Sequence, residues 1–301
     1  MATPSHPALA VIIPTLDEAE ALPRLLAELR TQTGVRLEIR VVDGGSRDDT
    51  VAHAQAGGAT VHHCVSPGRG RQMNLGHAHA RAPWRLFLHA DSRLSRPDQL
   101  HRALHRMCRY DPRQRAGHWP LRFDDVPPGH RRLFNFLEAK SHSGRPGSIH
   151  GDQGLLIHRD FLDRIGGFDE GLPFFEDVRL SAAIFRSGRW VTLPDALHTS
   201  ARRFRTEGVY SRYAAMGLMM LMDAAGDTAF LQEVPGLYRA QAAAGRLPLL
   251  PLAAAAAGRL ARKPDRWARA ARFMLENRWQ LPLMARAALS SGRHPPTPPA
   301  C

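Results

Sequence analysis

The sequence predicts an α/β fold, in which a mainly parallel sheet is flanked by helices and followed by a helical C-terminal extension. The first ~100 residues alternate short apolar runs with segments of helical periodicity, the pattern of successive βαβ units. Beyond about residue 205 the chain is alanine-rich and helical in pattern. We therefore predict an α/β domain over residues 8–205, a helical extension over 206–290 and a disordered tail over 291–301.

The first strand is predicted in "ALAVIIPT", residues 8–15, and a helix follows it. Its leucines, at 22, 25, 26 and 29, have the spacing of one apolar helical face. Thr15 and Glu18 match a T-x-x-E capping box, which predicts that this helix starts directly where the strand ends.

Three further strands are predicted in "LEIRVVD", "ATVHHC" and "WRLFLHAD". Helices follow the first two, with Ser46 or Asp49 as the cap of one and the other running through "QMNLGHAHA". Ligands of parallel sheets bind outside the carboxyl ends of the strands. The polar residues just past those ends therefore mark the predicted site: Asp17, Asp43, Arg69, Arg71 and Asp91.

The middle of the chain is less regular. We predict strands in "HWPLRF", "GLLIH" and "WVTLP", and helices from about residue 130 and in "RDFLDRI" and "EDVRLSAAIFRSG". The segment 141–154 is predicted to be a long loop, and loops of this length in compact domains are often lids or binding loops.

The formal charge of +13 and the pI near 11 raise the question of a polyanionic partner. Only Lys140 and Lys263 among the 41 basic residues are lysines, and the arginines are spread along the chain without a nucleic-acid recognition motif. We therefore predict no specific nucleic-acid partner. A diphosphate substrate or anionic lipid head groups would suit the charge equally well.

A basic helix is predicted in "DRWARAARFMLENRW", where Trp267, Ala271, Met274 and Leu275 share a face. Such a helix either lies on an anionic membrane surface or packs against its own domain. No apolar run is long enough to span a bilayer, the amino terminus has no secretory pattern, and the three cysteines form no disulfide framework. We therefore predict a cytoplasmic protein, with a peripheral position on the inner membrane face as an open alternative.

Five segments taken in order resemble the family 2 glycosyltransferases, which have the GT-A (nucleotide-diphospho-sugar transferase-like) fold. They are "VIIPTLDEAEAL", "VVDGGSRDDT", "FLHADSRL", "GDQGLLIHRDFLDRIGGFDE" and "FFEDVRLSAAIFRSG". More narrowly, "HAD", "GDQG" and "TSARRF" resemble the radical-SAM/selenodomain-associated subgroup. The resemblance implies an inverting transfer of a sugar from a nucleotide diphosphate donor to an unidentified hydroxyl or lipid-phosphate acceptor, with Mg²⁺ or Mn²⁺ as cofactor.

The resemblance also implies roles for individual residues. Asp91 matches the last Asp of the family's D-x-D metal motif, although His89 stands where the family usually has an acid, and His198 matches a later metal-binding histidine. The nucleotide-binding residues it implies are Pro14, Thr15, Glu18, Asp43 and Arg71.

The resemblance makes Asp177 the catalytic base, with Glu176 as the second choice, and places Asp152 near the acceptor or the sugar. The alternative for Glu176 and Asp177 is a structural role, in which acids at a helix start only complement the helix dipole. Because His89 replaces the first Asp of D-x-D, a non-catalytic nucleotide-sugar or carbohydrate binding protein on a GT-A fold is the alternative function. A dinucleotide oxidoreductase is set aside, because no G-x-G-x-x-G follows the first strand.

Overall fold

A computed structural model describes residues 8–234 and 249–289 of the chain, and these residues divide into two compact units. The first unit comprises residues 8–123 and 141–199. The second comprises residues 124–140, 200–234 and 249–289. The predicted disordered tail over 291–301 lies outside the described residues.

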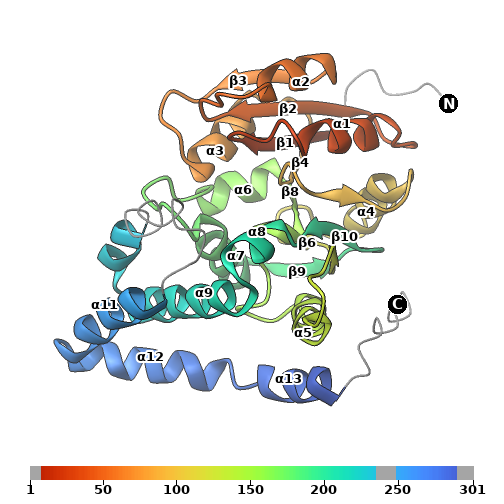
Figure 1. The fold of residues 1–301 in the computed structure, drawn as a ribbon. Helices are drawn as coiled ribbons and strands as arrows, with labels where there is room; N and C mark the ends of the chain where they lie inside the picture. The colour runs from red at the N-terminus through yellow and green to blue at the C-terminus, as the bar shows by residue number, and fades with distance from the viewer. Residues whose placement is uncertain (1–7, 235–248, 290–301) are drawn as a thin grey trace. The chain divides into compact units, whose positions relative to one another are not determined.

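The first unit is built on a seven-stranded sheet with the order β3-β2-β1-β4-β8-β6-β9 (Figure 1). Strands β1 to β4 are parallel, and of the three strands that follow them in the sheet only β8 runs in the opposite direction. This confirms the predicted mainly parallel sheet. The strands are β1 (Leu9–Thr15), β2 (Leu37–Asp43), β3 (Thr60–His63), β4 (Trp84–Phe87), β6 (Arg115–His118), β8 (Leu155–His158) and β9 (Arg189–Thr192).

Helices cover both faces of this sheet, because alternate residues of a strand point to opposite sides. Leu9, Val11 and Ile13 of β1 pack with helices α1, α2 and α4, whereas Ile12 packs with α3, α6 and α7. The helices are α1 (Leu22–Arg30), α2 (Thr50–Ala56), α3 (Arg69–His79), α4 (Gln99–Met107), α6 (Arg159–Ile165) and α7 (Glu176–Ser187).

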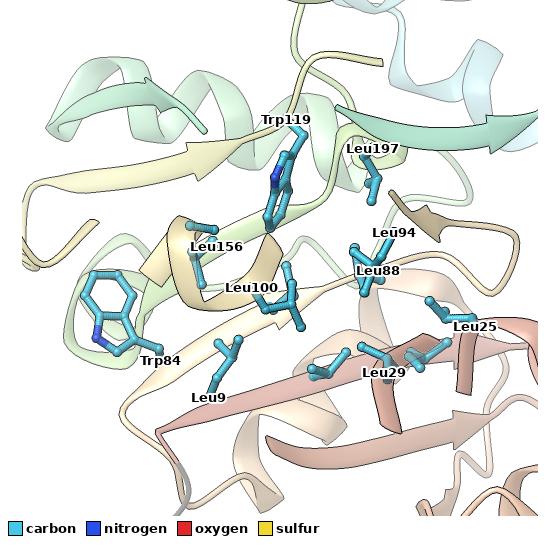
Figure 2. Packing of buried hydrophobic residues seen from close by; sticks show 14 of the residues in the cluster. Leu9, Leu25, Leu29, Trp84, Leu88, Leu94, Leu100, Trp119, Leu156 and Leu197 are labelled. Atoms are coloured by element: carbon cyan, nitrogen blue, oxygen red, sulfur yellow. The ribbon is translucent and has the colours of Figure 1, made fainter. Parts of the chain in front are cut away.

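The larger of the two cores lies between the sheet and helices α1 and α4. Figure 2 shows Leu25 and Leu29 of α1 and Leu100 of α4 directed toward the same space as Leu9 and Trp119. All five side chains are almost completely excluded from solvent. Apolar burial of this extent is the main stabilising term of the first unit.

The predicted strand "HWPLRF" is divided between two sheets. Trp119 and Pro120 interrupt it, so that β6 ends at His118 in the large sheet and β7 (Leu121–Asp124) joins a smaller sheet. Proline has no N–H to donate to a strand partner, which explains the break. The smaller sheet has the order β5-β10-β7, with the short strands β5 (Arg93–Leu94) and β10 (Leu197–Ser200), which the sequence did not predict.

The second unit is helical. It holds most of α5 (Arg131–His142), together with α8 (Arg202–Glu207), α9 (Val209–Ala224), α11 (Leu249–Ala261), α12 (Pro264–Glu276) and α13 (Gln280–Leu289). Asp227, just after α9, is 1% exposed and accepts hydrogen bonds from Arg259 of α11 and Arg266 of α12. These charge-assisted bonds hold α11 and α12 to the end of α9. Among the described residues, no helix combines the length and apolar character needed to cross a membrane.

Close packing of α3 on the sheet supplies a test of the fold. A Cβ added at Gly76 would overlap Ile12 Cγ2 and would lie 3.0 Å from Val42 Cγ2. We expect Gly76→Ala to destabilise the protein by about 1–3 kcal/mol through overpacking, seen as a lower melting temperature. Gly217, within α9, is the matched control, because a Cβ there meets nothing within 4 Å. Gly217→Ala is expected to leave the melting temperature unchanged or to raise it; an equal loss in both variants would contradict this account.

Candidate functional site

The loops that follow β1 and β2 are fastened to each other by side chains of the second loop. The backbone N–H groups of Glu18 and Ala19 donate to Thr50 Oγ1 (2.8 Å) and Asp48 Oδ2 (3.0 Å). The predicted capping box is therefore wrong: α1 begins only at Leu22, without a side-chain cap. Tertiary hydrogen bonds satisfy the backbone groups that a local cap would have served.

Thr15 and Asp43 lie side by side at the carboxyl ends of β1 and β2, where they are partners in the parallel register. The carboxylate of Asp43 is 2% exposed and accepts from the N–H groups of Gly45 (2.9 Å) and Ser46 (3.0 Å). The Gln72 side chain of α3 donates to the backbone oxygen of Thr15 at 2.8 Å. The hydroxyls of Ser46 and Thr15 also donate to Asp43, so its carboxylate is held in a fixed orientation at the end of the sheet.

The other residues predicted to bind the nucleotide lie near these strand ends. Pro14 belongs to β1, opposite Val42 of β2, and Glu18 lies in the loop that follows β1. Arg71 lies in the first turn of α3 and is exposed. Its side chain is accessible to an anion without a large rearrangement.

Three acids from distant parts of the sequence approach one another. Asp91 follows β4, Asp152 lies in a short 3₁₀ turn (Gly151–Gln153), and Asp177 lies in the first turn of α7. Burial, followed by the negative charges of Asp177 and Asp91, raises the pKa of Asp152 to about 6. Its Oδ1 atom is buried and accepts no hydrogen bond from the described residues. The cluster therefore carries negative charge that the protein only partly compensates.

Arg69, the first residue of α3, is the cation of this cluster. Its Nε atom donates to Glu176, and its Nη2 atom lies 3.9 Å from Asp177 Oδ1. Burial raises the pKa of Glu176 against the effect of Arg69, whereas at Asp177 the opposing effect of burial is outweighed by Arg69 and the pKa is lowered. Asp177 therefore binds its proton less tightly than Glu176, which is 1% exposed and forms an ion pair with Arg69.

The backbone of Gly151 lies against Asp177 and donates to its Oδ2 atom at 2.7 Å. A Cβ at Gly151 would lie 3.1 Å from His89 Nε2 and 3.2 Å from Asp177 Oδ2. A side chain here would displace these groups by a few tenths of an ångström, so glycine suits the close approach. His89 and His150 both lower the pKa of Asp177, which places two imidazoles within electrostatic reach of the carboxylate.

A pocket adjoins these groups. Its polar lining comes from His89, His150, Glu176 and Asp177, and the rest of the lining is largely apolar. The pair Glu176 and Asp177 is presented to it by a backbone turn at Phe175, which has φ 67°. A buried phenylalanine rarely adopts this left-handed conformation, so the surrounding packing must impose it.

A buried network supports the turn that carries Asp152. His118 is fully buried, and its ring Nδ1 atom hydrogen-bonds Gln153 Oε1 at 2.9 Å. Burial lowers the pKa of His118 to about 4, so the ring is neutral at pH 7 and its Nδ1–H is the donor. Gln153 in turn donates to the backbone oxygen of Ser148 (2.5 Å). Nothing in the sequence points to this role of His118, because the burial of one histidine leaves no local pattern.

The donor set favours a hard cation over a metal that needs nitrogen or sulfur. Carboxylate oxygens are the ligands of Mg²⁺ and similar ions, and the buried Asp152 carboxyl with Asp91 nearby fits such an ion. In the described part of the chain, no three His, Cys, Asp or Glu side chains form a metal-binding group. His198 lies on β10, opposite Arg93 of β5, a strand that begins two residues after Asp91. An ion held here would complete its coordination with oxygens of a ligand and water.

Arg69 and His150 also belong to the site, although the sequence analysis assigned neither a role. Arg69 had been placed only among the polar residues past the strand ends, because an arginine in a glycine-containing segment carries no distinctive spacing. His150 was part of the predicted loop 141–154. Partners more than 100 residues away, such as Glu176 for Arg69, decide these assignments.

The mostly parallel sheet, the helices on both faces and the acids past the strand ends define a protein of the GT-A class. The family model for "Glycosyl transferase family 2" matches residues 10–166, more than half of the chain. The chain therefore belongs to the family 2 glycosyltransferases.

Curated relatives match a shorter segment. A "PGL/p-HBAD biosynthesis glycosyltransferase" of Mycobacterium bovis is 36% identical over 102 residues, which is 32% of this chain and 40% of that protein. An "Uncharacterized glycosyltransferase" of Mycobacterium tuberculosis is 36% identical over 104 residues, 33% of this chain and 40% of that protein. The match thus spans about 40% of the length of these relatives.

Solved structures share the fold over more of the chain. A mannosyltransferase from Pyrobaculum calidifontis, in complex with GDP-Man and Mn²⁺, aligns with a TM-score of 0.57 and 21% identity over 95% of this chain and 87% of that one. S. aureus TarS, in complex with UDP, aligns with a TM-score of 0.51 and 17% identity over 71% of this chain and 65% of that one. At these identities the likeness establishes the GT-A-like fold.

The raised pKa of Asp152 predicts how stability depends on pH. Its folded pKa of about 6 lies above the usual Asp value, so the folded state holds the proton more tightly. The contribution of Asp152 to stability should therefore fall as the pH rises from about 4 to 6. We expect Asp152→Asn to melt higher than the wild type at pH 8, with the difference vanishing near pH 4.

Melting curves of both proteins across pH 4 to 8 measure this difference. Glu276→Gln is the control, because Glu276 forms an exposed ion pair with Arg272. The difference in melting temperature between Glu276→Gln and the wild type is expected to change little between pH 4 and pH 8. If the melting temperature of the wild type rose relative to that of Asp152→Asn as the pH rises, the predicted direction would be wrong.

Removing the cation of the cluster tests its electrostatics. Arg69→Met leaves the buried carboxylate of Glu176 without its partner, and we expect a loss of roughly 3 kcal/mol in the free energy of unfolding. Adding Glu176→Gln should restore part of that loss, because the unpaired charge is removed. Denaturant unfolding of the single and double variants measures this coupling.

Arg24→Met is the matched control, since Arg24 and Glu28 form an exposed i,i+4 pair worth less than about 1 kcal/mol. If both arginine substitutions were equally destabilising, or the double variant were no better than Arg69→Met, the role assigned to the buried pair would be wrong.

Proposed function

We propose that the protein is an inverting, metal-dependent glycosyltransferase that moves a sugar from a nucleotide diphosphate donor to a hydroxyl or lipid-phosphate acceptor. One observation carries the proposal: Asp152 lies within electrostatic reach of Asp91, Asp177 and Arg69, and a buried Asp43 stands at the carboxyl end of β2. The radical-SAM/selenodomain-associated subgroup remains our assignment on the motifs "HAD", "GDQG" and "TSARRF".

The nucleoside would bind at the ends of β1 and β2. Asp43 is fixed by two backbone N–H groups and by the Ser46 hydroxyl, and we propose that it marks the base-binding end of the pocket at these strand ends. Thr15, Pro14 and Glu18 would line the same pocket. Arg71 at the start of α3 would contact the diphosphate, since a guanidinium forks onto phosphate oxygens.

Asp91 would hold a Mg²⁺ or Mn²⁺ ion, with His198 as a further candidate ligand, and Asp152 would lie near the acceptor or the sugar. The ion would supply positive charge where the nucleoside diphosphate leaves. The mannosyltransferase of similar fold is described in complex with GDP-Man and Mn²⁺, which is consistent with this cofactor. His89 is a weaker candidate, because its Nε2 atom faces Gly151 beside Asp177.

Asp177 would act as the base. Its pKa is lowered, so the carboxylate is ionised at pH 7 and accepts a proton, whereas Glu176 is committed to Arg69. As the acceptor oxygen attacks the anomeric carbon, its proton passes to Asp177, the new C–O bond forms and the bond to the diphosphate breaks on the opposite face. This geometry inverts the anomeric carbon.

A non-catalytic binding protein on the same fold is the second candidate, and it is favoured only by His89 in place of the first acid of D-x-D. Burial of Glu176 opposes it: keeping a paired, 1% exposed carboxylate next to an ionised Asp177 is costly in a protein that needs no base. The cytoplasmic location predicted from the sequence belongs to the same proposal.

Ligand-dependent melting separates these functions. UDP, GDP and their sugars are tested with and without Mn²⁺ on the wild type, Asp91→Asn and Asp177→Asn. A ligand present at 100 times its dissociation constant stabilises the folded state by ~2.7 kcal/mol. We expect one nucleotide to stabilise the wild type in a Mn²⁺-dependent way, and Asp91→Asn to lose that dependence. Asp177→Asn should keep nucleotide binding and lose turnover.

Donor turnover is followed by NMR, which also reports the anomeric configuration of the product. Retention of configuration would refute the inverting mechanism. Stabilisation by a nucleotide sugar with neither transfer nor hydrolysis would favour the binding protein. If no nucleotide stabilised the wild type, the proposed donor class would be wrong.

A further inference from the structure

The outer surface of α12 and α13 is unusually apolar for a solvent-facing region. We use "α12–α13 surface" for its large exposed side chains, which are Trp267, Met274, Leu275, Leu281, Met284 and Leu289. Trp267 is 55% exposed and Leu275 63% exposed. Both helices lie in the second unit and follow one another along the chain (Figure 1).

This apolar surface is distinct from the face by which α12 packs in its own unit. Ala270 is 2% exposed and Phe273 half-buried, so they mark the inward side of the helix, which contacts α9 and α11. Trp267 and Met274 are seven residues apart and share a different face. One prediction from the sequence is that the face with Trp267 and Met274 packs against its own domain. Within the second unit, the structure instead packs the face with Ala270 and Phe273.

Basic side chains accompany the α12–α13 surface. Residues 249–289 contain eight basic and two acidic side chains. The two acids, Asp265 and Glu276, pair with Arg269 and Arg272. Arg259 and Arg266 pair with Asp227. The other four basic residues have no acidic partner among the residues that the structure describes: Arg262, Lys263, Arg278 and Arg286.

We propose that the α12–α13 surface docks on an anionic lipid bilayer. Apolar side chains enter the boundary between head groups and acyl chains, while arginines and lysine bind the negative head groups. A second copy of the chain is the disfavoured occupant, because it presents the same basic surface and the chain carries a net charge of +13. The inference rests on the second unit and not on the proposed sugar transfer.

Vesicle flotation of the full chain tests the proposal. Phosphatidylcholine vesicles are compared with vesicles that also contain phosphatidylglycerol, at low and at moderate salt. We expect binding to the anionic vesicles only, and a loss of about tenfold in partition for Trp267→Gln, because the largest apolar anchor is removed. Arg278→Gln should weaken binding to the anionic vesicles by about fivefold.

Tyr210→Gln is the matched control, since Tyr210 is an exposed aromatic residue of α9 in the same unit, 65% exposed. It should bind vesicles as the wild type does. Circular dichroism and nucleotide-dependent melting of Trp267→Gln verify that its fold and donor site are intact, so failure of docking is distinguished from failure of the proposed function.

Absence of wild-type binding to anionic vesicles, or equal losses in Trp267→Gln and Tyr210→Gln, would overturn the proposal. So would a dimer in sedimentation that Trp267→Gln converts to a monomer, because the surface would then be an interface between copies.

Discussion

The gathering of like charges around one arginine is the constraint on which the first unit depends. Three carboxylates, at positions 91, 152 and 177, come within electrostatic reach of one another, and Glu176 is buried beside them. Arg69 opposes this repulsion at Glu176 and Asp177 but not fully at Asp152, whose pKa remains raised. Holding such groups together requires a rigid frame, since each would otherwise move toward water.

The sheet and its loops provide that frame. The parallel register places the ends of β1 and β2 side by side, and hydrogen bonds from the second loop fix the first. On the other side of the cluster, the His118 to Gln153 hydrogen bond holds the turn that carries Asp152. The left-handed residue Phe175 starts α7 in the orientation that directs Asp177 to Gly151. The packing of the two apolar cores stabilises the left-handed conformation of Phe175 and the burial of His118.

The second unit combines a buried ion-pair anchor with an exposed apolar surface. Its internal polar anchor, Asp227 with two arginines, is buried, whereas the side chains of the α12–α13 surface expose large apolar area next to basic groups. An exposed apolar patch of this kind is expected where a surface meets a partner. Charge and apolarity together favour an anionic lipid surface as that partner.

Local pattern sufficed to predict much of the chain. Apolar periodicity predicted β1 to β4, the helices that follow the first three of them and the helical character of the end of the chain, because burial selects side chains at every second or every third to fourth position. It also predicted that polar residues past the strand ends would share one region. The family followed from motifs in order, and the family model confirms it.

Features that depend on distant partners could not be predicted in this way. Thr15 and Glu18 have the spacing of a capping box, but Thr50 and Asp48 bind the loop more favourably, and α1 starts later. Likewise, the role of Arg69 is decided by Glu176, a partner 107 residues away. The sequence by itself thus determined the class of fold and the acids of the candidate site. Only the tertiary structure decided which of those acids are paired, buried or ionised, because these properties depend on the charges and solvent exclusion that folding brings around each group.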